Sequence, residues 1–403
     1  KKQLARYREE TSQKMDPQQA QQRMRTVLSH LSQRPARPEE PLQAATTSAD
    51  KPLSREEFSK VFPVIVEDVL QELLSDTHLQ MPPYARDWVK RVLEVNVPGG
   101  KMNRGLTVVH SLPLLQSSVS QNDIFRACVL GWAIEALQAF FLVADDLMDQ
   151  SVTRRGQPCW YRQDHPLSKT NDKVGLIAIN DSFLLEAVIY RWLQKYFRDT
   201  PYYVDLLELF HEVTYQTELG QLLDLTSQPS SGFVDLSLFK LDTYKRIVRW
   251  KTAYYSFYMP VALAMLMAGF KDPAAFDEAK SILLPMGEYF QVQDDYLDCY
   301  GDPKVIGKVG RDIEENKCGW LICQAVLLAN PAQKKLLAKH YAKEDPADVK
   351  IVKDIYRELN LENVFQRYEE QSFQELRALI QNTEHVPKGV YQGLLEKIYK
   401  RSI

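Results

Sequence analysis

The sequence predicts an all-α fold, a single large bundle in which roughly ten or more helices surround a central cavity. Three observations support this prediction. From residue 54 onward, apolar residues recur at the three- and four-residue spacing of amphipathic helices in one segment after another. Glycine and proline fall mostly between these segments, and no segment shows a strong strand-like alternation. Two blocks of the form Asp-Asp-x-x-Asp, at residues 145–149 and 294–298, lie in apolar sequence, so we expect them to face each other across a cavity.

Residues 1–52 are predicted to form a polar N-terminal extension with a proline-containing linker, and residues 53–403 the helical domain. The first 34 residues are rich in Gln, Arg and Lys, and Pro35, Pro38, Pro41 and Pro52 follow. An Arg-rich amphipathic N-terminus is typical of a mitochondrial presequence, but several acidic residues in this one argue against it. We therefore expect a solvated extension and a cytoplasmic protein, with a mitochondrial protein that has lost a presequence as the alternative.

The helices of the domain are predicted in order from its N-terminus. Ser54 and Glu57 have the spacing of a capping box, which opens a helix at residues 58–74. Residues 98–105, Pro-Gly-Gly-Lys-Met-Asn-Arg-Gly, are predicted to form a glycine-rich turn. The remaining helices are expected at about residues 85–96, 123–148, 172–197, 202–225, 236–250, 251–268, 273–300, 317–328, 331–341, 347–358, 361–380 and 388–399.

Composition excludes several classes of protein. The formal net charge is −3, so no bulk positive field attracts nucleic acid. The longest apolar stretch recognised in the sequence, residues 261–270, is too short to span a bilayer, and we predict no membrane span. The five cysteines include no Cys-x-x-Cys pair, which favours a reducing compartment over a disulfide framework or a thiolate zinc site.

The two acidic blocks predict a site for hard cations. Asp145 and Asp149 lie about one helical turn apart, and like charges at this spacing destabilise an isolated helix unless a cation lies between them. Asp294 and Asp298 repeat the arrangement. Mg²⁺ takes one or two carboxylates together with waters and substrate phosphates, so each block supplies a partial coordination shell. One such block is more often a solvated acidic face, but two blocks in apolar sequence favour a site for metal and polyphosphate.

Three groups of basic residues complement these blocks. Paired guanidinium groups suit bidentate contact with phosphate oxygens, and a glycine-rich turn with cations suits a further phosphate group. Each group alone is weak evidence, because surface loops are often basic. Together they predict two separate phosphate-bearing substrates. The groups are Lys101 with Arg104, Arg154 with Arg155, and Lys304, Lys308 and Lys317.

Several motifs together carry a resemblance to a known family. They are GGKMNRGL at 99–106, QAFFLVADDLMD at 138–149, TRRGQ at 153–157, YQTELGQ at 215–221, KTAYYSFY at 251–258, FQVQDDYLD at 290–298, GKVGRDI at 307–313 and NKC at 316–318. From about residue 53 to its C-terminus, the chain resembles the trans-prenyltransferases of the isoprenoid synthase fold, most closely the animal farnesyl diphosphate synthases. The first fifty residues lie outside this resemblance.

The resemblance implies a Mg²⁺-dependent condensation of isopentenyl diphosphate with dimethylallyl and then geranyl diphosphate. Several Mg²⁺ ions, with Mn²⁺ as an alternative, would be held by Asp145, Asp149 and Asp294, with Asp295 and Asp298 supporting them indirectly. It also implies a homodimer, and isoprenoid diphosphates as the ligands.

The resemblance further implies a role for individual side chains. Arg154, Lys251, Lys308 and Lys317 would neutralise the allylic diphosphate as it leaves. The allylic cation would be stabilised by the Thr252 hydroxyl, the Lys251 carbonyl and Gln291, and the departing diphosphate would remove the final proton. Isopentenyl diphosphate would be bound by Lys101, Arg104 and Arg155, near Gln138.

Helical geometry links the first acidic block to product length. Phe141 precedes Asp145 by about one turn, or roughly 5 Å, on nearly the same helix face, and Phe140 is beside it. If the product grows away from the metal site, these rings form the floor of its cavity. By the resemblance, Phe-Phe at these positions implies a C15 product.

Three alternatives stay open at this point. The same fold could make geranyl or geranylgeranyl diphosphate, it could be a single-substrate terpene cyclase, or the chain could be a non-catalytic subunit that regulates a partner synthase. A cyclase would not need Lys101 and Arg104, and a silent subunit would not need mutually repelling carboxylates.

The C-terminus carries Lys400 and Arg401, which is fewer cations than the basic tail of the family usually has. The resemblance implies that this tail closes over the second substrate, but the small number of cations weakens that expectation.

Overall fold

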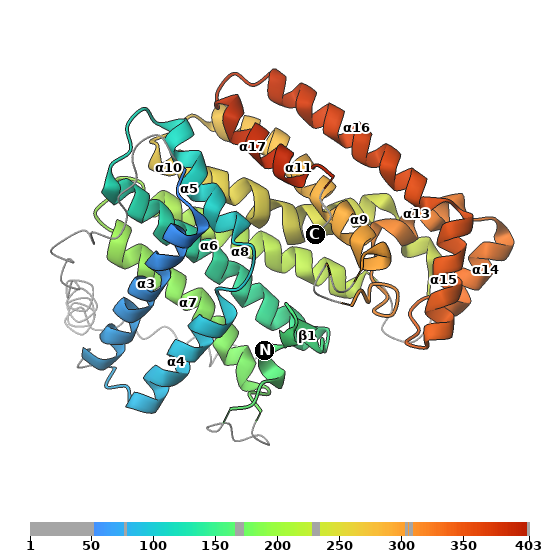
Figure 1. The fold of residues 1–403 in the computed structure, drawn as a ribbon, viewed down its shortest axis with the longest axis horizontal. Helices are drawn as coiled ribbons and strands as arrows, with labels where there is room; N and C mark the ends of the chain where they lie inside the picture. The colour runs from blue at the N-terminus through green and yellow to red at the C-terminus, as the bar shows by residue number, and fades with distance from the viewer. Residues whose placement is uncertain are drawn as a thin grey trace, which may run out of the picture. The chain divides into compact units, whose positions relative to one another are not determined.

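The computed structural model describes residues 52–75, 79–165, 173–227, 234–302, 305 and 309–400. The predicted extension therefore lies outside the described residues up to position 51, and its boundary stays a prediction. All the elements below belong to the compact unit Leu42–Ile403. As predicted, this unit is all-α, and the described residues contain fourteen α-helices (Figure 1).

The α-helices are α3 (Arg55–Ser75), α4 (Pro83–Asn96), α5 (Asn103–Leu115), α6 (Gln121–Met148), α7 (Ile177–Phe197), α8 (Tyr203–Thr226), α9 (Leu241–Val248), α10 (Met259–Met267), α11 (Pro273–Tyr300), α13 (Trp320–Leu328), α14 (Pro331–His340), α15 (Pro346–Glu358), α16 (Leu361–Gln381) and α17 (Lys388–Ile398). Three short helical elements, η1 (Trp160–Arg162), η2 (Leu236–Leu238) and η3 (Arg249–Tyr258), and two strands, β1 (Thr153–Arg154) and β2 (Gln157–Pro158), complete the described chain.

The start of α3 confirms the predicted capping box. The backbone N–H of Ser54 donates to Glu57 Oε2 at 2.8 Å, and the backbone N–H of Glu57 donates to Ser54 Oγ at 3.2 Å. This reciprocal pair satisfies two donors that the first helical turn would otherwise leave without a partner. A second capping box, between Ser120 and Asp123, opens α6.

Some of the predicted boundaries are wrong. The glycine-rich turn ends at Met102 and α5 follows it, because the apolar residues after Gly105 pack as a helix that the pattern of glycines concealed. The helix expected from residue 172 begins only at Ile177. The single helix expected at residues 236–250 is divided into η2 and α9. Two residues on either side of the turn at Arg155 form an antiparallel β-hairpin that the sequence did not predict.

The expected break between residues 250 and 251 is also wrong. α9, η3 and α10 follow one another directly, and η3 is a π-helix of ten residues. A π-helix accommodates an extra residue per turn, and such turns are frequent at functional sites. This segment carries Lys251 and Thr252, so the irregular turn determines where both residues lie.

α6 is the most deeply buried long helix near the middle of the bundle. It packs against α5 and α7, while η3 packs against α8 and α11. Within the described residues, α6 is the one helix long and apolar enough to cross a membrane, and 78% of its apolar window is buried inside the protein. The walls made by α6, α8, η3 and α11 enclose the cavity described below.

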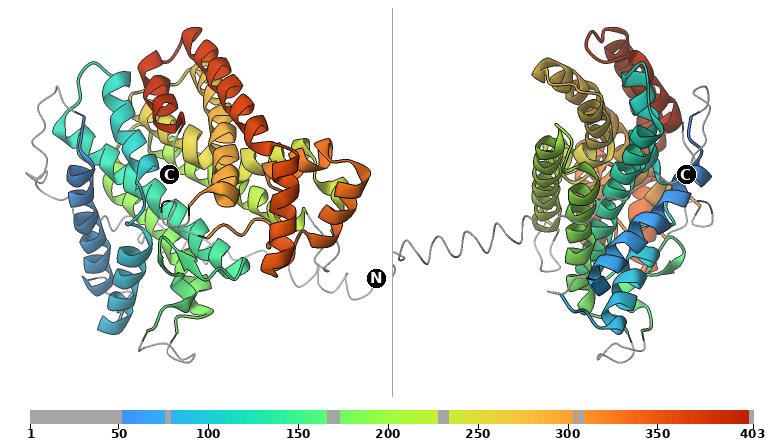
Figure 2. Two further views of the ribbon diagram at one scale, coloured as in Figure 1. Left: turned by 45° about the vertical axis from the view of Figure 1, so that its right-hand side comes forward. Right: turned by 90° about the vertical axis from the view of Figure 1, so that its left-hand side faces the viewer.

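The C-terminal helices extend the bundle. α14 and α15 lie at the end opposite α3 and α4, and α17 packs against α5, α11 and α16 (Figures 1 and 2). A second cluster of buried apolar residues there includes Trp320, Tyr341 and Phe365. It supports the loop that closes one side of the cavity.

Candidate functional site

A single cavity of about 950 Å³ collects most of the predicted site residues. Its walls come from α6, α8, η3, α11 and the segment 309–319. Fourteen of the predicted residues line it: Arg104, Gln138, Phe141, Asp145, Asp149, Arg154, Arg155, Lys251, Thr252, Gln291, Asp294, Asp295, Asp298 and Lys317. Lys101 and Phe140 do not, and Lys304, Lys308 and Arg401 lie outside the described residues.

The first acidic block points into this cavity from the last turn of α6. Asp145 Oδ1 accepts from Gln221 Nε2 at 2.9 Å and lies 3.3 Å from Lys251 Nζ, and its Oδ2 lies 3.4 Å from Arg154 Nη2. Asp149 lies one turn later, where its Oδ2 accepts from Lys317 Nζ at 2.8 Å. Burial acts to raise the pKa of Asp145, but Lys251, Lys317 and Arg154 outweigh it and lower the pKa overall. The carboxylate is therefore held ionised.

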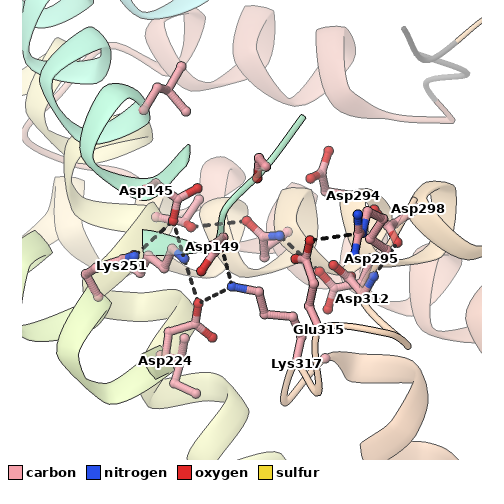
Figure 3. A pocket seen from close by; sticks show the side chains of 18 of the residues that line it. Asp145, Asp149, Asp224, Lys251, Asp294, Asp295, Asp298, Asp312, Glu315 and Lys317 are labelled. Carbon is pink, nitrogen blue, oxygen red and sulfur yellow. Dashed lines mark hydrogen bonds and ion pairs between the residues drawn. The ribbon is translucent and has the colours of Figure 1, made fainter. Parts of the chain in front are cut away.

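Asp224 is a site residue that sequence analysis missed. It extends from α8 and joins two lysines, with Oδ2 at 2.6 Å from Lys251 Nζ and 3.3 Å from Lys317 Nζ (Figure 3). Burial would raise the pKa of Asp224, yet the two lysines lower it overall. A signal was present in the sequence, because Gln221 and Asp224 are spaced like one face of a helix within otherwise apolar residues.

The second acidic block faces the first from α11 (Figure 3). Asp295 is buried, where it accepts from Gln291 Nε2 at 3.0 Å and from the backbone N–H of Trp320 at 2.8 Å. Burial, together with the neighbouring Asp294, raises the pKa of Asp295 to about 7. Asp298 accepts from the backbone N–H of Asp312 at 3.1 Å, which ties α11 to the loop before α13.

The donor set fits hard divalent cations. Ten carboxyl groups and six lysine or arginine side chains line the cavity, so the described wall carries an excess of acid. Oxygen donors are what Mg²⁺ prefers, and it usually completes its shell with waters and substrate phosphates. Within the described residues, no three His, Cys, Asp or Glu side chains lie close enough together to form a metal site by themselves. Asp145, Asp149 and Asp224 are instead paired with Lys251, Lys317 and Arg154.

The π-helix η3 presents Thr252 to α11. Thr252 Oγ1 donates to Gln291 Oε1 at 3.1 Å, and Gln291 in turn donates to Asp295, so a chain of hydrogen bonds connects η3 to the second acidic block. The backbone of η3 also touches α8, because a Cβ on Gly220 would lie 2.1 Å from the backbone nitrogen of Lys251. Only glycine permits this approach, which brings Lys251 next to Asp224.

The β-hairpin positions the two adjacent arginines differently. Arg154 Nη2 donates to Asp146 Oδ1 at 2.6 Å, and Asp146 is buried. Arg155 occupies the turn with a φ of +54° and donates to the Pro98 carbonyl oxygen at 2.8 Å. The guanidinium of Arg155 therefore lies next to the glycine-rich turn that carries Lys101. Two of the basic groups predicted from the sequence thus adjoin each other here.

Arg104 reaches the cavity from the first turn of α5. Its Nη2 donates to Ser256 Oγ at 2.7 Å and to the Tyr255 hydroxyl at 3.0 Å, and its guanidinium lies 4.6 Å from the centre of the Tyr255 ring. Lys101 is exposed on the turn before it and does not line the cavity wall.

The two phenylalanines predicted as a floor have separate positions. Phe141 lines the cavity, with its ring centre 5.8 Å from that of Tyr255. Phe140 is buried behind it, at 4.7 Å between ring centres. Phe141 thus faces the cavity directly, whereas Phe140 supports its ring.

Comparisons with known proteins agree with this site. A family model described as polyprenyl synthetase matches residues 86–359. The chain is 56% identical to farnesyl diphosphate synthase of Dictyostelium discoideum, over 96% of this chain and 99% of that protein. It is 51% identical to farnesyl pyrophosphate synthase of Gallus gallus, over 86% of this chain and 92% of that protein. The match to the Dictyostelium protein leaves only 4% of the chain uncovered, so it takes in most of residues 1–52, which we had expected to lie outside the resemblance.

Solved structures give the same result. The fold is similar to that of T. brucei farnesyl diphosphate synthase complexed with minodronate, with a TM-score of 0.79, 34% sequence identity and coverage of 86% of this chain and 99% of that chain. The complex of the same enzyme with risedronate gives a TM-score of 0.77 at 35% identity, with the same coverage. The chain therefore belongs to the polyprenyl synthetase family, within its group of farnesyl diphosphate synthases.

Proposed function

We propose that this chain condenses isopentenyl diphosphate with dimethylallyl diphosphate, and then with geranyl diphosphate, to form farnesyl diphosphate. The observation that carries the proposal is one cavity in which two acidic blocks face each other and two separate groups of cations reach the wall. One cation group adjoins the acidic blocks, and the other lies on the side of the glycine-rich turn. Two diphosphate substrates require two such groups.

Asp145, Asp149 and Asp294 would hold Mg²⁺, with Mn²⁺ as an alternative ion. When bound, the ions would neutralise the allylic diphosphate and polarise it for departure. The lysines that pair with Asp145, Asp149 and Asp224 would then lie beside that diphosphate. Arg154, Lys251 and Lys317 would then contact phosphate oxygens. We propose the same role for Lys308.

The allylic carbon chain would lie between η3 and α6. The Thr252 hydroxyl oxygen, the Lys251 carbonyl and Gln291 would present partial negative charge to the cation that forms when the carbon–oxygen bond breaks. Phe141 lies on α6 about one turn from Asp145, so its ring would limit how far the product extends. Phe140 would hold that ring in place.

Isopentenyl diphosphate would bind at the other end of the cavity. Arg104 and Arg155 reach this end from α5 and from the hairpin, with Gln138 of α6 between them and the acidic block. Lys101 would join them from the exposed turn.

A homodimer is also part of the proposal. α7 and α8 pack side by side and expose a row of large apolar side chains that a second copy could cover. Ring stacking between Tyr190 and His211, with 4.5 Å between centres, connects the two helices within this row. The exposed apolar residues are Ile179 and Phe183 on α7, and Tyr215, Leu219 and Leu222 on α8.

Incubation of the purified chain with isopentenyl and dimethylallyl diphosphates tests the proposed reaction. We expect a C15 product and release of diphosphate that require Mg²⁺ or Mn²⁺ and stop when a chelator is added. A C10 or C20 end product would assign a different chain length to the same fold. Absence of any diphosphate release would favour a non-catalytic regulatory subunit.

A further inference from the structure

The first turn of α5 has no capping side chain of its own. Met102 occupies the N-cap position with a φ of +55°, and its side chain makes no capping hydrogen bond; its sulfur accepts from Ser59 Oγ instead. An N-cap side chain ordinarily accepts from the second or third backbone N–H of the helix. In α5 these two N–H groups belong to Arg104 and Gly105.

A glutamate from the neighbouring helix takes the place of this cap. Glu135 Oε1 accepts from the backbone N–H of Gly105 at 2.9 Å, and the carboxyl also receives the backbone N–H of Arg104. Glu135 is only 2% exposed, so water does not compete for these donors. Burial raises the pKa of Glu135, while Arg104, Arg155 and the N–H groups act in the opposite direction.

Two glycines make this contact geometrically possible. A Cβ on Gly105 would lie 2.8 Å from the Gly131 carbonyl oxygen, and a Cβ on Gly131 would lie 2.7 Å from that of Gly105. The backbones of α5 and α6 therefore touch at this crossing. Glu135 lies four residues, or about one turn, after Gly131 on the same face of α6. Its carboxyl group reaches the end of α5 for this reason.

The same face of α6 continues into the cavity. Gln138, Leu142, Asp145 and Asp149 follow Glu135 at the three- and four-residue spacing of one helix face, and all four line the cavity. Glu135 marks the buried end of this face. The guanidinium of Arg104 projects from the turn that Glu135 caps, toward Ser256 and Tyr255.

We propose that Glu135 is a positioning residue for the second diphosphate site: by capping α5 from α6, it sets the backbone at Arg104 so that its guanidinium can bind isopentenyl diphosphate. Because Glu135 accepts from the backbone N–H groups of Arg104 and Gly105, these two donors are not available to the substrate. This inference rests on the proposed assignment of Arg104 to isopentenyl diphosphate.

Two substitutions at this position separate capping from simple packing. Glu135→Met keeps the shape but removes the acceptor, and we expect it to raise KM for isopentenyl diphosphate by about tenfold or more. KM for the allylic substrate and kcat should change less than about threefold. Glu135→Gln retains an acceptor oxygen for the N–H of Gly105, so its KM should stay within about threefold of the parent value. Calorimetric binding of isopentenyl diphosphate to the folded variants should follow the same order.

A matched control removes an ordinary N-cap elsewhere. Asn330 accepts from the backbone N–H groups of Ala332 and Gln333 at the start of α14, which does not line the cavity. Asn330→Met should lower the melting temperature and leave KM for isopentenyl diphosphate unchanged. An equal rise of both KM values in Glu135→Met, or a Gln variant no better than the Met variant, would overturn the positioning role.

The assignment of Arg104 is tested separately. If Arg104→Gln leaves KM for isopentenyl diphosphate unchanged, the proposed substrate site is wrong. If Arg104→Gln raises this KM and Glu135→Met does not, only the positioning role fails. Should Glu135→Met not fold, the Gln variant and Glu135→Asp are measured in its place, and failure of all three to fold would assign Glu135 a structural role only.

Discussion

Lys317 and Asp149 form an ion pair across the cavity, with 2.8 Å between Nζ and Oδ2, although 168 positions separate them in the chain. Lys317 also lies 3.3 Å from Asp224, so one ammonium group balances carboxylates from two helices. Burial would lower the pKa of Lys317, but Asp224 and Asp149 raise it well above its ordinary value. The lysine is therefore charged throughout the physiological range and holds the cavity walls together when no other cation does.

Replacement of this lysine should lower the stability of the protein. Lys317→Gln leaves Asp149 and Asp224 without their shared cation, which should lower the free energy of unfolding by about 1.5–3 kcal/mol. Divalent cations should reduce this loss, because they supply positive charge at the same carboxylates. Chemical unfolding with and without Mg²⁺ measures the difference. A loss of stability that Mg²⁺ does not change would contradict this account of the pair.

Shortening the side chain of Phe141 should lengthen the product. Phe141→Ala opens the cavity floor directly, whereas Phe140→Ala removes only the support behind it, so the single Phe141 variant should shift product further toward C20. The double variant should shift it furthest. Sizing of the products by radiochromatography gives the order, and an unchanged profile in the double variant would exclude these rings as the floor.

A methyl group on Gly220 should displace Lys251. The added Cβ would lie 2.1 Å from the Lys251 backbone nitrogen, so η3 and α8 must move apart. Gly220→Ala should destabilise the fold by about 1–3 kcal/mol and lower kcat, because Lys251 and Thr252 move together.

The matched control for this variant is an exposed glycine of α17. A Cβ on Gly393 would meet no atom within 4 Å. Gly393→Ala should stabilise the protein by up to about 1 kcal/mol through helix propensity, with kcat unchanged. Equal effects at the two positions would show that packing against Lys251 is not the cause.

Glu278 should make the anchoring of α17 dependent on pH. Its carboxylate accepts from the backbone N–H groups of Glu384, His385 and Val386, at 2.6 to 3.0 Å. Burial acts to raise the pKa of Glu278, but these donors outweigh it and lower the pKa overall. A lowered pKa in the folded state stabilises the protein above the ordinary value of 4.5, and the contribution is lost as the pH falls through the folded-state pKa.

Glu278→Gln tests this directly. The variant should be less stable than the parent at pH 7, and the difference should shrink as the pH falls below 4.5. Urea unfolding at a series of pH values measures both proteins. A difference that stays constant down to the acid limit would indicate that ionisation of Glu278 plays no part.

The proposed dimer surface predicts a change of oligomeric state. Phe183 is 59% exposed on α7, and a charge at this position would be buried against the second copy. Phe183→Glu should shift the chain from dimer to monomer in light scattering after gel filtration. Leu327 is 63% exposed at the end of α13, away from this row, and Leu327→Glu should leave the dimer intact. A parent chain that is monomeric at micromolar concentration would refute the surface.

Local patterns were sufficient for much of the fold and for the kinds of residue at the site. The capping box at Ser54, the extent of α11 and the two acidic blocks all follow from spacing within one helix, because propensity and periodicity act over a few residues. The same local reasoning missed α5, where the glycines before it suggested a turn, and it divided a continuous helical run at Lys251, where a π-helix was not foreseen.

The sequence by itself determined an all-α chain, the composition of the site and which side chains share a helix face with Asp145. Only the tertiary structure decided which cation pairs with which carboxylate: Asp224 with Lys251 and Lys317, and Arg154 with Asp146. It also decided that Phe141 rather than Phe140 faces the cavity, and that Glu135 caps a helix other than its own. The pairing of Asp224 with Lys251 and the cap from Glu135 depend on how closely two helical elements approach, which Gly220 and Gly131 allow at these crossings. Helix periodicity carries no information about such distances.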